Sequence, residues 1–345
     1  MVRRYTEGTE FTLSAFLLHR TQRSPFLGTG DRSESKVTSP LGYLAAAFRP
    51  LPRLAVGVAF QPSTGIGANY AFPDGSELEL SAGVAELNFA AAYGITEALW
   101  VGLSYRPSYF IQSLKQPLFT EQGMPTGQTT ELSLSTLEPL GLTLGVHYNL
   151  LPTTDLAFVY KSRVSAELSG ESKTPFGTFD ATSDYATPDK FQFGISHRTL
   201  ADRLLMELQV NLVMYGWLPN RSDTTIELPT GPSTLSVVAD DSNVVFINAG
   251  VEYWLIPQFL AARAGIVFGP ENQNEETPSY FAVYQGFHYS PFFGMGVDFG
   301  RLELNAAFGL TPMHGADIAR TTNSTNTGRY ESAQLFGGLA ARYVL

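Results

Sequence analysis

Few side chains of this sequence are spaced for covalent or metal chemistry. The chain has no cysteine, which excludes thiolate metal sites and a disulfide scaffold. Its five histidines are scattered, and none has a partner at the spacing of a metal-ligand pair: His19, His147, His197, His288 and His314. The glycines of stretch 65–67 precede no helix pattern, so a phosphate-binding loop is not expected. We therefore expect no enzyme, cofactor or metal, and a Ser–His pair assembled across strands is the remaining enzymatic alternative.

Basic side chains offer a different chemistry, the binding of an anionic group. Four candidates lie in segments where polar and apolar residues alternate: Lys161, Arg163, Arg263 and Arg301. Guanidinium groups bind a carboxylate through two parallel hydrogen bonds, so a ligand with a carboxylate group is one candidate. The alternative, favoured for any single residue, is that neighbouring charges such as Arg301 and Glu303 pair with each other and fill a narrow interior.

The elements that hold these residues are predicted from period-two alternation. Between 301 and 310 the even positions are apolar, from Leu302 to Leu310, whereas Arg301, Glu303 and Asn305 share the other face. A strand sorts such residues onto opposite faces, and a helix would scatter them. Similar segments recur and predict about 14 strands, roughly at 10–19, 40–49, 53–62, 84–94, 97–110, 139–148, 153–168, 189–199, 203–214, 243–254, 258–269, 288–298, 301–311 and 334–345.

The connections between these segments alternate in length. Short ones include 50–52, 95–96, 149–152 and 299–300, and the long ones between them are rich in Ser, Thr, Asn, Gly and Pro. Short periplasmic turns and long extracellular loops are typical of outer-membrane barrels. The predicted fold class is all-β, a transmembrane antiparallel up-and-down β-barrel. It forms a single domain over 1–345, and both termini are expected on the periplasmic side.

Bulk composition agrees with this class. Charged residues are 16% of the 345 residues, and the net charge of −10 argues against a nucleic-acid surface. No stretch approaches the roughly 18 apolar residues of a transmembrane helix. The polar start, Met1 to Glu10, lacks the apolar core of a signal peptide. For an exported barrel we expect that the signal has been removed or that the chain is a fragment, and a cytosolic protein is the alternative.

The two faces of the predicted strands indicate their surroundings. One face is apolar and uncharged, as at Leu54, Val56, Val58 and Phe60. A charge at mid-bilayer costs about 2–4 kcal/mol, so the charged face is expected to line the lumen. Tyrosines near strand ends on the apolar face indicate an aromatic girdle: Tyr105, Tyr148, Tyr253 and Tyr343. Five aromatic residues are expected to face inward and to make the lumen partly apolar: Phe16, Phe48, Trp100, Phe246 and Phe292.

Several segments resemble the FadL/TodX family of outer-membrane transporters for hydrophobic compounds. They follow the family's order and spacing: 52–70 (PRLAVGVAFQPSTGIGANY), 157–170 (AFVYKSRVSAELSG), 187–198 (TPDKFQFGISHR) and 261–278 (AARAGIVFGPENQNEETP). The last strand, 334–345, is similar to the terminal assembly signal of outer-membrane proteins, although Leu345 stands where a Phe is usual. The family's N-terminal hatch segment with its Asn-Pro-Ala motif is missing, so we expect either a truncated plug or a different gate.

The resemblance implies where a ligand enters and leaves. It implies a capture site between the third and fourth long loops. The alternative is that these loops pack on each other and only cap the barrel. Four apolar loop residues are predicted to line that site: Leu114, Phe119, Phe176 and Phe179. The resemblance also implies a kinked third strand and a lateral gate at Pro62, Gly65 and Gly67, where the alternation breaks. The alternative is that Pro62 ends the strand and the glycines belong to a loop.

The predicted function is passive uptake of hydrophobic small molecules, such as long-chain fatty acids, across the outer membrane by loop capture and lateral release. Expected partners are the hydrophobic ligand and outer-membrane lipid, with no nucleic acid, and the oligomeric state stays open. A general diffusion porin is the first alternative and a structural or adhesive barrel is the second. A large steady conductance in planar bilayers would favour the porin.

Overall fold

The computed structural model describes residues 8–25, 32–71, 75–119, 125–238, 240–270, 287–319 and 327–345. Apart from one 3-10 turn at Tyr215–Trp217, the regular structure of these residues is β-strand. Within these ranges, no helix is long and apolar enough to cross a membrane.

Twenty strand segments follow one another along the chain. Their bounds are β1 (Thr9–Pro25), β2 (Arg32–Leu51), β3 (Leu54–Ala71), β4 (Glu77–Gly94), β5 (Leu99–Tyr105), β6 (Ser108–Phe119), β7 (Pro125–Glu138), β8 (Leu142–Leu151), β9 (Thr154–Lys161), β10 (Val164–Thr174), β11 (Gly177–Thr187), β12 (Lys190–Thr199), β13 (Leu204–Val213), β14 (Arg221–Leu228), β15 (Gly231–Val238), β16 (Val244–Ile256), β17 (Leu260–Pro270), β18 (Phe287–Asp298), β19 (Leu302–Ile318) and β20 (Gly328–Val344).

Six barrel strands are each broken into two segments. β5 gives way to β6 at Pro107, β7 to β8 at Pro139, and β11 to β12 at Pro188; β9–β10, β13–β14 and β15–β16 complete the six. Proline cannot donate the N–H that a sheet ladder needs, so pairing is interrupted there. Counted this way, 14 antiparallel strands form a closed barrel, in which β20 pairs with β1 from Glu10↔Val344 onward. The predicted fold class and strand number are confirmed.

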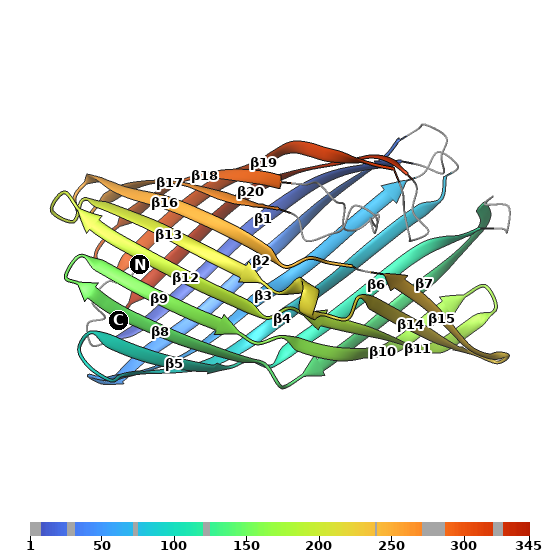
Figure 1. Ribbon diagram of the computed structural model, residues 1–345, viewed down its shortest axis with the longest axis horizontal. Helices are drawn as coiled ribbons and strands as arrows, with labels where there is room; N and C mark the ends of the chain where they lie inside the picture. Colours follow the sequence, from blue (N-terminus) through green and yellow to red (C-terminus); the bar gives the residue numbers. More distant parts are fainter. Residues whose placement is uncertain are drawn as a thin grey trace.

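The broken strands divide the barrel into two tiers (Figure 1). In the tier near the termini, β5, β8, β9, β12 and β13 pair in turn between β4 and β16. In the far tier, β6, β7, β10, β11, β14 and β15 pair in turn from β4. The prediction of long loops across 111–138 and 169–188 is therefore wrong, because these residues are largely strand. Most of their exposed side chains are polar, with Ile111, Leu137 and Phe176 as exposed apolar residues, so they lack the regular apolar alternation of a lipid-facing strand.

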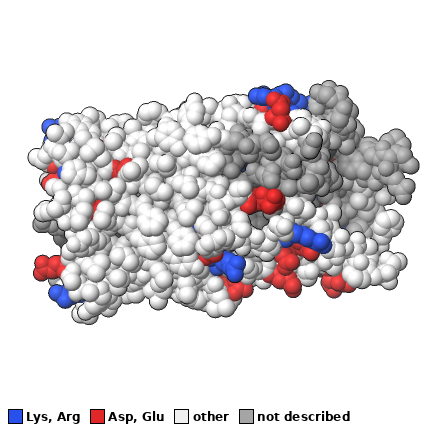
Figure 2. Space-filling model, in the orientation of Figure 1, with Lys and Arg blue, Asp and Glu red and all other residues white. Residues whose placement is uncertain are grey.

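The outer surface of the near tier is apolar. Large side chains that are about half exposed form it on many strands, among them Leu13, Leu17, Leu44, Phe60 and Leu339. The four predicted girdle tyrosines are also exposed on this surface, by 36–42%. On the face seen in Figure 2, charged side chains lie toward both ends, and a band left of centre carries none. Apolar surface of this extent is unfavourable in water and suits surrounding lipid.

Phe48 belongs to this outer surface. It pairs with Val56 of β3, stands in phase with Leu44 on β2, and is 48% exposed. The prediction that Phe48 faces the lumen is therefore wrong, because the alternation of β2 has the opposite phase. Phe292 does face inward, and its ring lies 5.3 Å from that of Phe336.

Short turns connect the strands at the end of the barrel where both termini lie (Figure 1). The turn from β12 to β13 uses Leu200, Ala201 and Asp202, which have φ of 53°, 53° and 65°. The turn from β18 to β19 uses Gly300 with φ of 87°. An even number of strands returns the chain to the end at which it began, so the two termini share one end.

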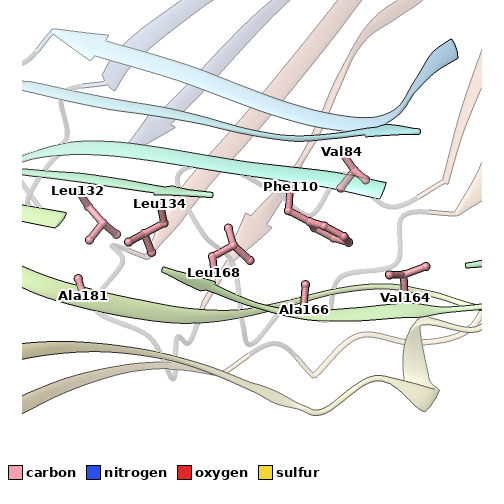
Figure 3. Packing of buried hydrophobic residues seen from close by; sticks show 8 residues of the cluster. All are labelled: Val84, Phe110, Leu132, Leu134, Val164, Ala166, Leu168 and Ala181. Atoms are coloured by element: carbon pink, nitrogen blue, oxygen red, sulfur yellow. The ribbon is translucent and has the colours of Figure 1, made fainter. Parts of the chain in front are cut away.

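An apolar cluster fills the inside of the far tier (Figure 3). Its members are at most 8% exposed: Val84, Phe110, Leu132, Leu134, Val164, Ala166, Leu168 and Ala181. Leu114, Tyr185 and Ile226 pack against them, and the Phe110 and Tyr185 rings meet edge to face with centroids 5.6 Å apart. The far tier is thus held together by a hydrophobic core of its own.

Candidate functional site

The barrel wall is interrupted between β2 and β3. The two strands pair as far as Leu44↔Phe60 and meet again at Ser35↔Tyr70, where the Asn69 N–H also donates to Ser35 Oγ at 2.7 Å. The segments between these pairs have no ladder pairing with each other. Each strand keeps its other neighbour, because β2 pairs with β1 and β3 pairs with β4 along this stretch. The interruption is therefore a local separation of two strands within an otherwise closed sheet.

A bulge in β3 accompanies the separation. The register with β4 shifts between Pro62 and Thr64, so Ser63 is an extra residue that bends the strand. β3 continues unbroken through Gly65 and Gly67, so the alternative that Pro62 ends the strand is wrong. Whether this segment acts as a gate stays a prediction.

Two side chains from other strands hold the bulge. Lys161 Nζ reaches across the interior from β9 and donates to Ser63 Oγ at 2.9 Å. Tyr185 of β11 forms a hydrogen bond with Thr64, and burial raises the pKa of its phenol, which therefore stays protonated. The bend in β3 is thus supported by both tiers of the barrel.

A buried charge cluster lies beside the bulge. Glu86 of β4 is 0% exposed, and Arg106, in the break between β5 and β6, is 1% exposed. Arg106 Nη1 donates to Glu86 Oε1 at 2.6 Å, and its Nη2 donates to the carbonyl oxygen of Ser162 at 2.6 Å. The second carboxylate oxygen, Glu86 Oε2, accepts from Lys161 Nζ at 2.8 Å and from Gln61 Nε2 at 3.2 Å. One carboxylate therefore ties β3, β4, β9 and the β5–β6 break together.

Lys190 adds a third cation to this cluster. It stands directly across from Lys161 on the paired strands β9 and β12. The charged groups that act on Lys190 are Glu86 and Arg106. Like charges placed directly opposite each other on a sheet repel. Arg106 and Lys161 bond to the single carboxylate of Glu86, and Lys190 stands beside them, so the cluster has an excess of positive charge that a bound anionic group would relieve.

Nearer the termini, a ladder of alternating charges lines the interior. Arg263 lies 2.7 Å from Glu252 and 3.3 Å from Glu303. Arg342 lies 3.4 Å from Glu303 and 2.7 Å from Glu10. Each guanidinium stands between two carboxylates, and Glu303 is shared by both, so two arginines balance two of the three acids of the ladder.

A glycine makes room for the ladder. β18 separates β17 from β19, and its Gly296 pairs with a residue of each. A Cβ at Gly296 would lie 2.6 Å from Arg263 Nη1 and 2.6 Å from Asn305 Oδ1. The guanidinium can therefore pass over β18 toward Glu303 only because no side chain stands at this position.

Below the ladder, a cavity of about 1310 Å³ opens at the terminal end, lined in part by Arg49 and Trp100.

Known structures share this architecture. A FadL homologue from Pseudomonas aeruginosa matches with a TM-score of 0.83 and 14% identity, over 98% of this chain and 91% of that chain. The toluene transporter TodX of Pseudomonas putida matches with a TM-score of 0.78 and 14% identity, over 99% of this chain and 91% of that chain. The chain has the FadL-type barrel fold. The toluene transporter TbuX of Ralstonia pickettii also matches, with a TM-score of 0.74 and 17% identity, over 98% of this chain and 90% of that chain. No family model and no curated protein matches the sequence.

Two of the predicted anion-binding residues have carboxylate partners in this FadL-type barrel. Lys161 bonds to Glu86, and Arg263 belongs to the ladder, as the pairing interpretation expected. Arg301 lies in the turn after Gly300 and lines the terminal cavity. Glu303 pairs with two other arginines, so the expected Arg301–Glu303 pair is wrong, because the turn carries Arg301 away from the ladder.

Arg163 does not face the lumen. It lies between β9 and β10, is exposed, and borders an outer pocket with Tyr160 and Trp217. The expectation that it shares the inward face of Lys161 is therefore wrong. Continuous alternation would put both on one face, but the break at 162–163 reverses the phase, so Val164 points into the apolar cluster and Arg163 points outward.

The apolar residues predicted to capture ligand lie in different surroundings. Leu114 is half-buried against the interior cluster, whereas Phe176 is 85% exposed at the turn between β10 and β11. Phe179 is half-buried on β11, where it lies close to Gly177. The side chain of Phe119 lies outside the described residues. A common pocket for these four residues stays a prediction.

Sequence reasoning missed three members of the charge cluster. Glu86, Arg106 and Lys190 all have the inward phase of their segments, and a lone charge in the apolar run 84–94 was an available signal for Glu86. Alternation predicts which face a residue occupies but not its height in the barrel. Their meeting around Glu86 depends on the register of strands that are distant in sequence.

Proposed function

We propose that this protein is an outer-membrane channel for the passive uptake of hydrophobic small molecules. The observation that carries the proposal is the separation of β2 from β3 beside a charged interior site, in a closed barrel with an apolar outer surface. The similar structures include toluene transporters, which supports a hydrophobic cargo. The aromatic and apolar belt supports a location in the outer membrane.

The cargo that suits the charge cluster best is a hydrophobic carboxylate, such as a long-chain fatty acid. Lys161 and Arg106 share the single carboxylate of Glu86, and Lys190 stands opposite Lys161, so a second carboxylate would be favourable there. Both Nη atoms of Arg106 already donate to Glu86 and a backbone carbonyl, and the Nε, which has no partner, is buried. We therefore assign the contact with cargo to the two lysines, and Lys190 makes the principal contact.

The exit that suits such a cargo is sideways, between β2 and β3. The bilayer is the preferred solvent of an alkyl chain, and each methylene kept out of water is worth about 0.8 kcal/mol. The charge cluster and the opening are linked, because Lys161 binds both Glu86 and Ser63 of the bulge. Cargo bound at the lysines would stand next to the opening. The bonds from Lys161 and Tyr185 would hold β3 bent in the absence of cargo.

A porin interpretation predicts an open aqueous lumen. The apolar cluster of the far tier argues against it, because eight packed side chains occupy the inside of the barrel there. The cavity at the terminal end, about 1310 Å³ and lined by several charged residues, is the feature that favours a porin. These two candidates differ in the solutes that they admit.

The test compares hydrophobic and hydrophilic solutes on the same refolded protein. We expect liposomes or cells carrying the protein to take up a labelled long-chain fatty acid faster than protein-free controls. Small sugars should enter no faster, and planar bilayers should show little steady conductance. A large conductance with sugar-driven liposome swelling would replace the proposal with a porin. Absence of uptake for both solutes would favour a structural barrel.

A further inference from the structure

A shallow pocket lies on the outer surface of the barrel where β9 gives way to β10. It is lined by Tyr160, Ser162, Arg163, Asp189 and Trp217. The residue between the first two, Lys161, points the other way and bonds to Glu86 inside the barrel. The pocket is therefore separate from the proposed cargo site, with the barrel wall between them.

Aromatic and polar contacts build the pocket. The Phe191 ring lies 5.1 Å from the Tyr160 ring and meets the Trp217 ring edge to face at 6.2 Å. Asp189, which is 7% exposed, accepts from the Tyr160 hydroxyl at 2.7 Å and from the Arg163 backbone N–H at 3.0 Å. Both bonds reach Asp189 Oδ1, and neither uses the Arg163 guanidinium. That guanidinium is exposed, and among the described residues it has no ion pair within 4.0 Å.

The pocket stands at the edge of the apolar belt. Below it on the outer face lie Phe158 and Phe193, with ring centroids 4.9 Å apart. Above it the exposed residues of β10 are polar, namely Ser165 and Glu167. Tyrosine and tryptophan favour the level at which lipid tails meet headgroups, because their rings are apolar and carry one polar group. The Arg163 guanidinium therefore lies at headgroup height.

We propose that this pocket binds the phosphate headgroup of a phosphorylated outer-leaflet lipid. The planar guanidinium of Arg163 matches two phosphate oxygens. The Ser162 hydroxyl, which accepts the Leu142 N–H at 3.0 Å, keeps its own hydrogen to donate. The rings of Trp217 and Phe191 offer an apolar surface to the first part of an acyl chain. The lipid would support the break between β9 and β10, which follows directly on Lys161.

The experiment measures lipid retention on the purified, folded barrel by native mass spectrometry in detergent. The probes are diphosphoryl lipid A, the same lipid without its phosphates, and inorganic phosphate. We expect the phosphorylated lipid to be retained, and Arg163→Gln to reduce the retained fraction about tenfold, as expected for a lost charged hydrogen bond. Arg221→Gln, which removes another exposed arginine from the outer surface of the far tier, serves as the matched control and should retain the lipid.

Two results would overturn the proposal. The first is equal retention by Arg163→Gln and the wild type. The second is equal retention of the dephosphorylated lipid, because the phosphate is then not recognised. Displacement of the lipid by inorganic phosphate would also count against the proposal, since the site would then take a free phosphate rather than a lipid headgroup. Trp217→Ala should lower retention without abolishing it, and full retention by this variant would also count against the pocket. Cargo uptake by Arg163→Gln separates this proposal from the proposed function, because the two sites lie on opposite faces of the wall.

Discussion

At the scale of single residues, the interior depends on charges that are buried and shared. Glu86 and Arg106 are almost fully enclosed, and each satisfies a partner that water cannot reach. Removing one member of a buried ion pair leaves the other uncompensated, which costs more than the pair contributes when intact. Lys190 differs, because it adds charge to the cluster without a carboxylate of its own.

The first prediction concerns Glu86. Changing Glu86→Gln should destabilise the folded barrel by about 3 kcal/mol, because Arg106, Lys161 and Lys190 would then face one another without a carboxylate. The urea midpoint of the barrel in detergent micelles measures this. Glu167→Gln, an exposed acid on β10, is the control and should leave the midpoint unchanged. Equal midpoints for both variants would show that the cluster is solvated.

The second prediction separates cargo binding from stability. Lys190→Gln should weaken the binding of a long-chain fatty acid about tenfold, because a charged hydrogen bond to the carboxylate is lost. Binding of the corresponding fatty alcohol should not change, and neither should the urea midpoint. Tryptophan quenching on the refolded protein follows both ligands. If the acid and the alcohol lose affinity equally, the lysine does not recognise the carboxylate.

At the scale of elements, small irregularities decide what each strand can do. The extra residue Ser63 bends β3 away from β2, and prolines break three of the six divided strands. Gly296 in β18 leaves the space that the Arg263 guanidinium occupies. Each irregularity lies at a place where a regular strand would close a gap or block a contact.

The third prediction concerns the bend of β3. Replacing Pro62, Gly65 and Gly67 together with Thr or Val should straighten the strand and close the opening. A Cβ at Gly67 would stand 3.2 Å from Val37 Cγ1 of β2, so Val37 would have to shift slightly while the new side chain fills the space between the two strands. Uptake of labelled fatty acid by cells should then fall to the level of cells without the protein, at equal surface expression. Uptake at the wild-type rate would exclude lateral exit and direct attention to the lumen.

The bonds that hold the bulge can be tested with a milder change. Ser63→Ala removes one of the two acceptors of Lys161 Nζ and leaves Glu86, whereas Ser63→Thr keeps a hydroxyl at the same place. We expect Ser63→Ala to slow uptake severalfold while leaving the equilibrium affinity for fatty acid intact, and Ser63→Thr to restore the rate. Equal rates in all three proteins would mean that the bulge holds its shape without Lys161.

The fourth prediction concerns Gly296. Gly296→Ala should destabilise the barrel by about 1–3 kcal/mol, because the new methyl group would overlap the guanidinium of Arg263 and break the ladder. Gly145→Ala is the matched control, since a Cβ at Gly145 meets nothing within 4 Å. Thermal or urea unfolding in micelles compares the two. A destabilised Gly145→Ala with an unaffected Gly296→Ala would show that the ladder does not depend on the missing side chain at Gly296.

At the scale of the whole molecule, we propose that the two tiers lie in two solvents. The near tier presents a belt of apolar side chains, whereas the far tier mixes polar side chains with exposed apolar ones such as Leu137 and Leu235 and has a hydrophobic interior of its own. A strand that faces lipid must satisfy its backbone within the sheet, and closure of β20 on β1 leaves no free edge at that point. The far tier is held by its own packed side chains, so its strands can extend into water.

The fifth prediction maps this boundary in intact cells. The chain has no cysteine, so single cysteines report without background. Ser169→Cys on the far tier should react with a membrane-impermeant maleimide, and Leu144→Cys on the near tier should react only after the membrane is dissolved. Both positions are exposed on the outer surface of the barrel. Equal labelling of both in intact cells would mean that the near tier does not lie in lipid.

The sequence alone determined the class of fold, because the side-chain period of a strand is local and survives in any register. Alternation in segments such as 301–310, with short and long connections in turn, was enough to predict the barrel and its number of strands. Only the tertiary structure decided which side of the wall Arg163 occupies, because a two-residue break reverses the phase. It also decided that Glu86, Arg106, Lys161 and Lys190 meet, since their heights depend on the register of four separate strands. Long-range pairing sets that register, and no local pattern in the sequence records it.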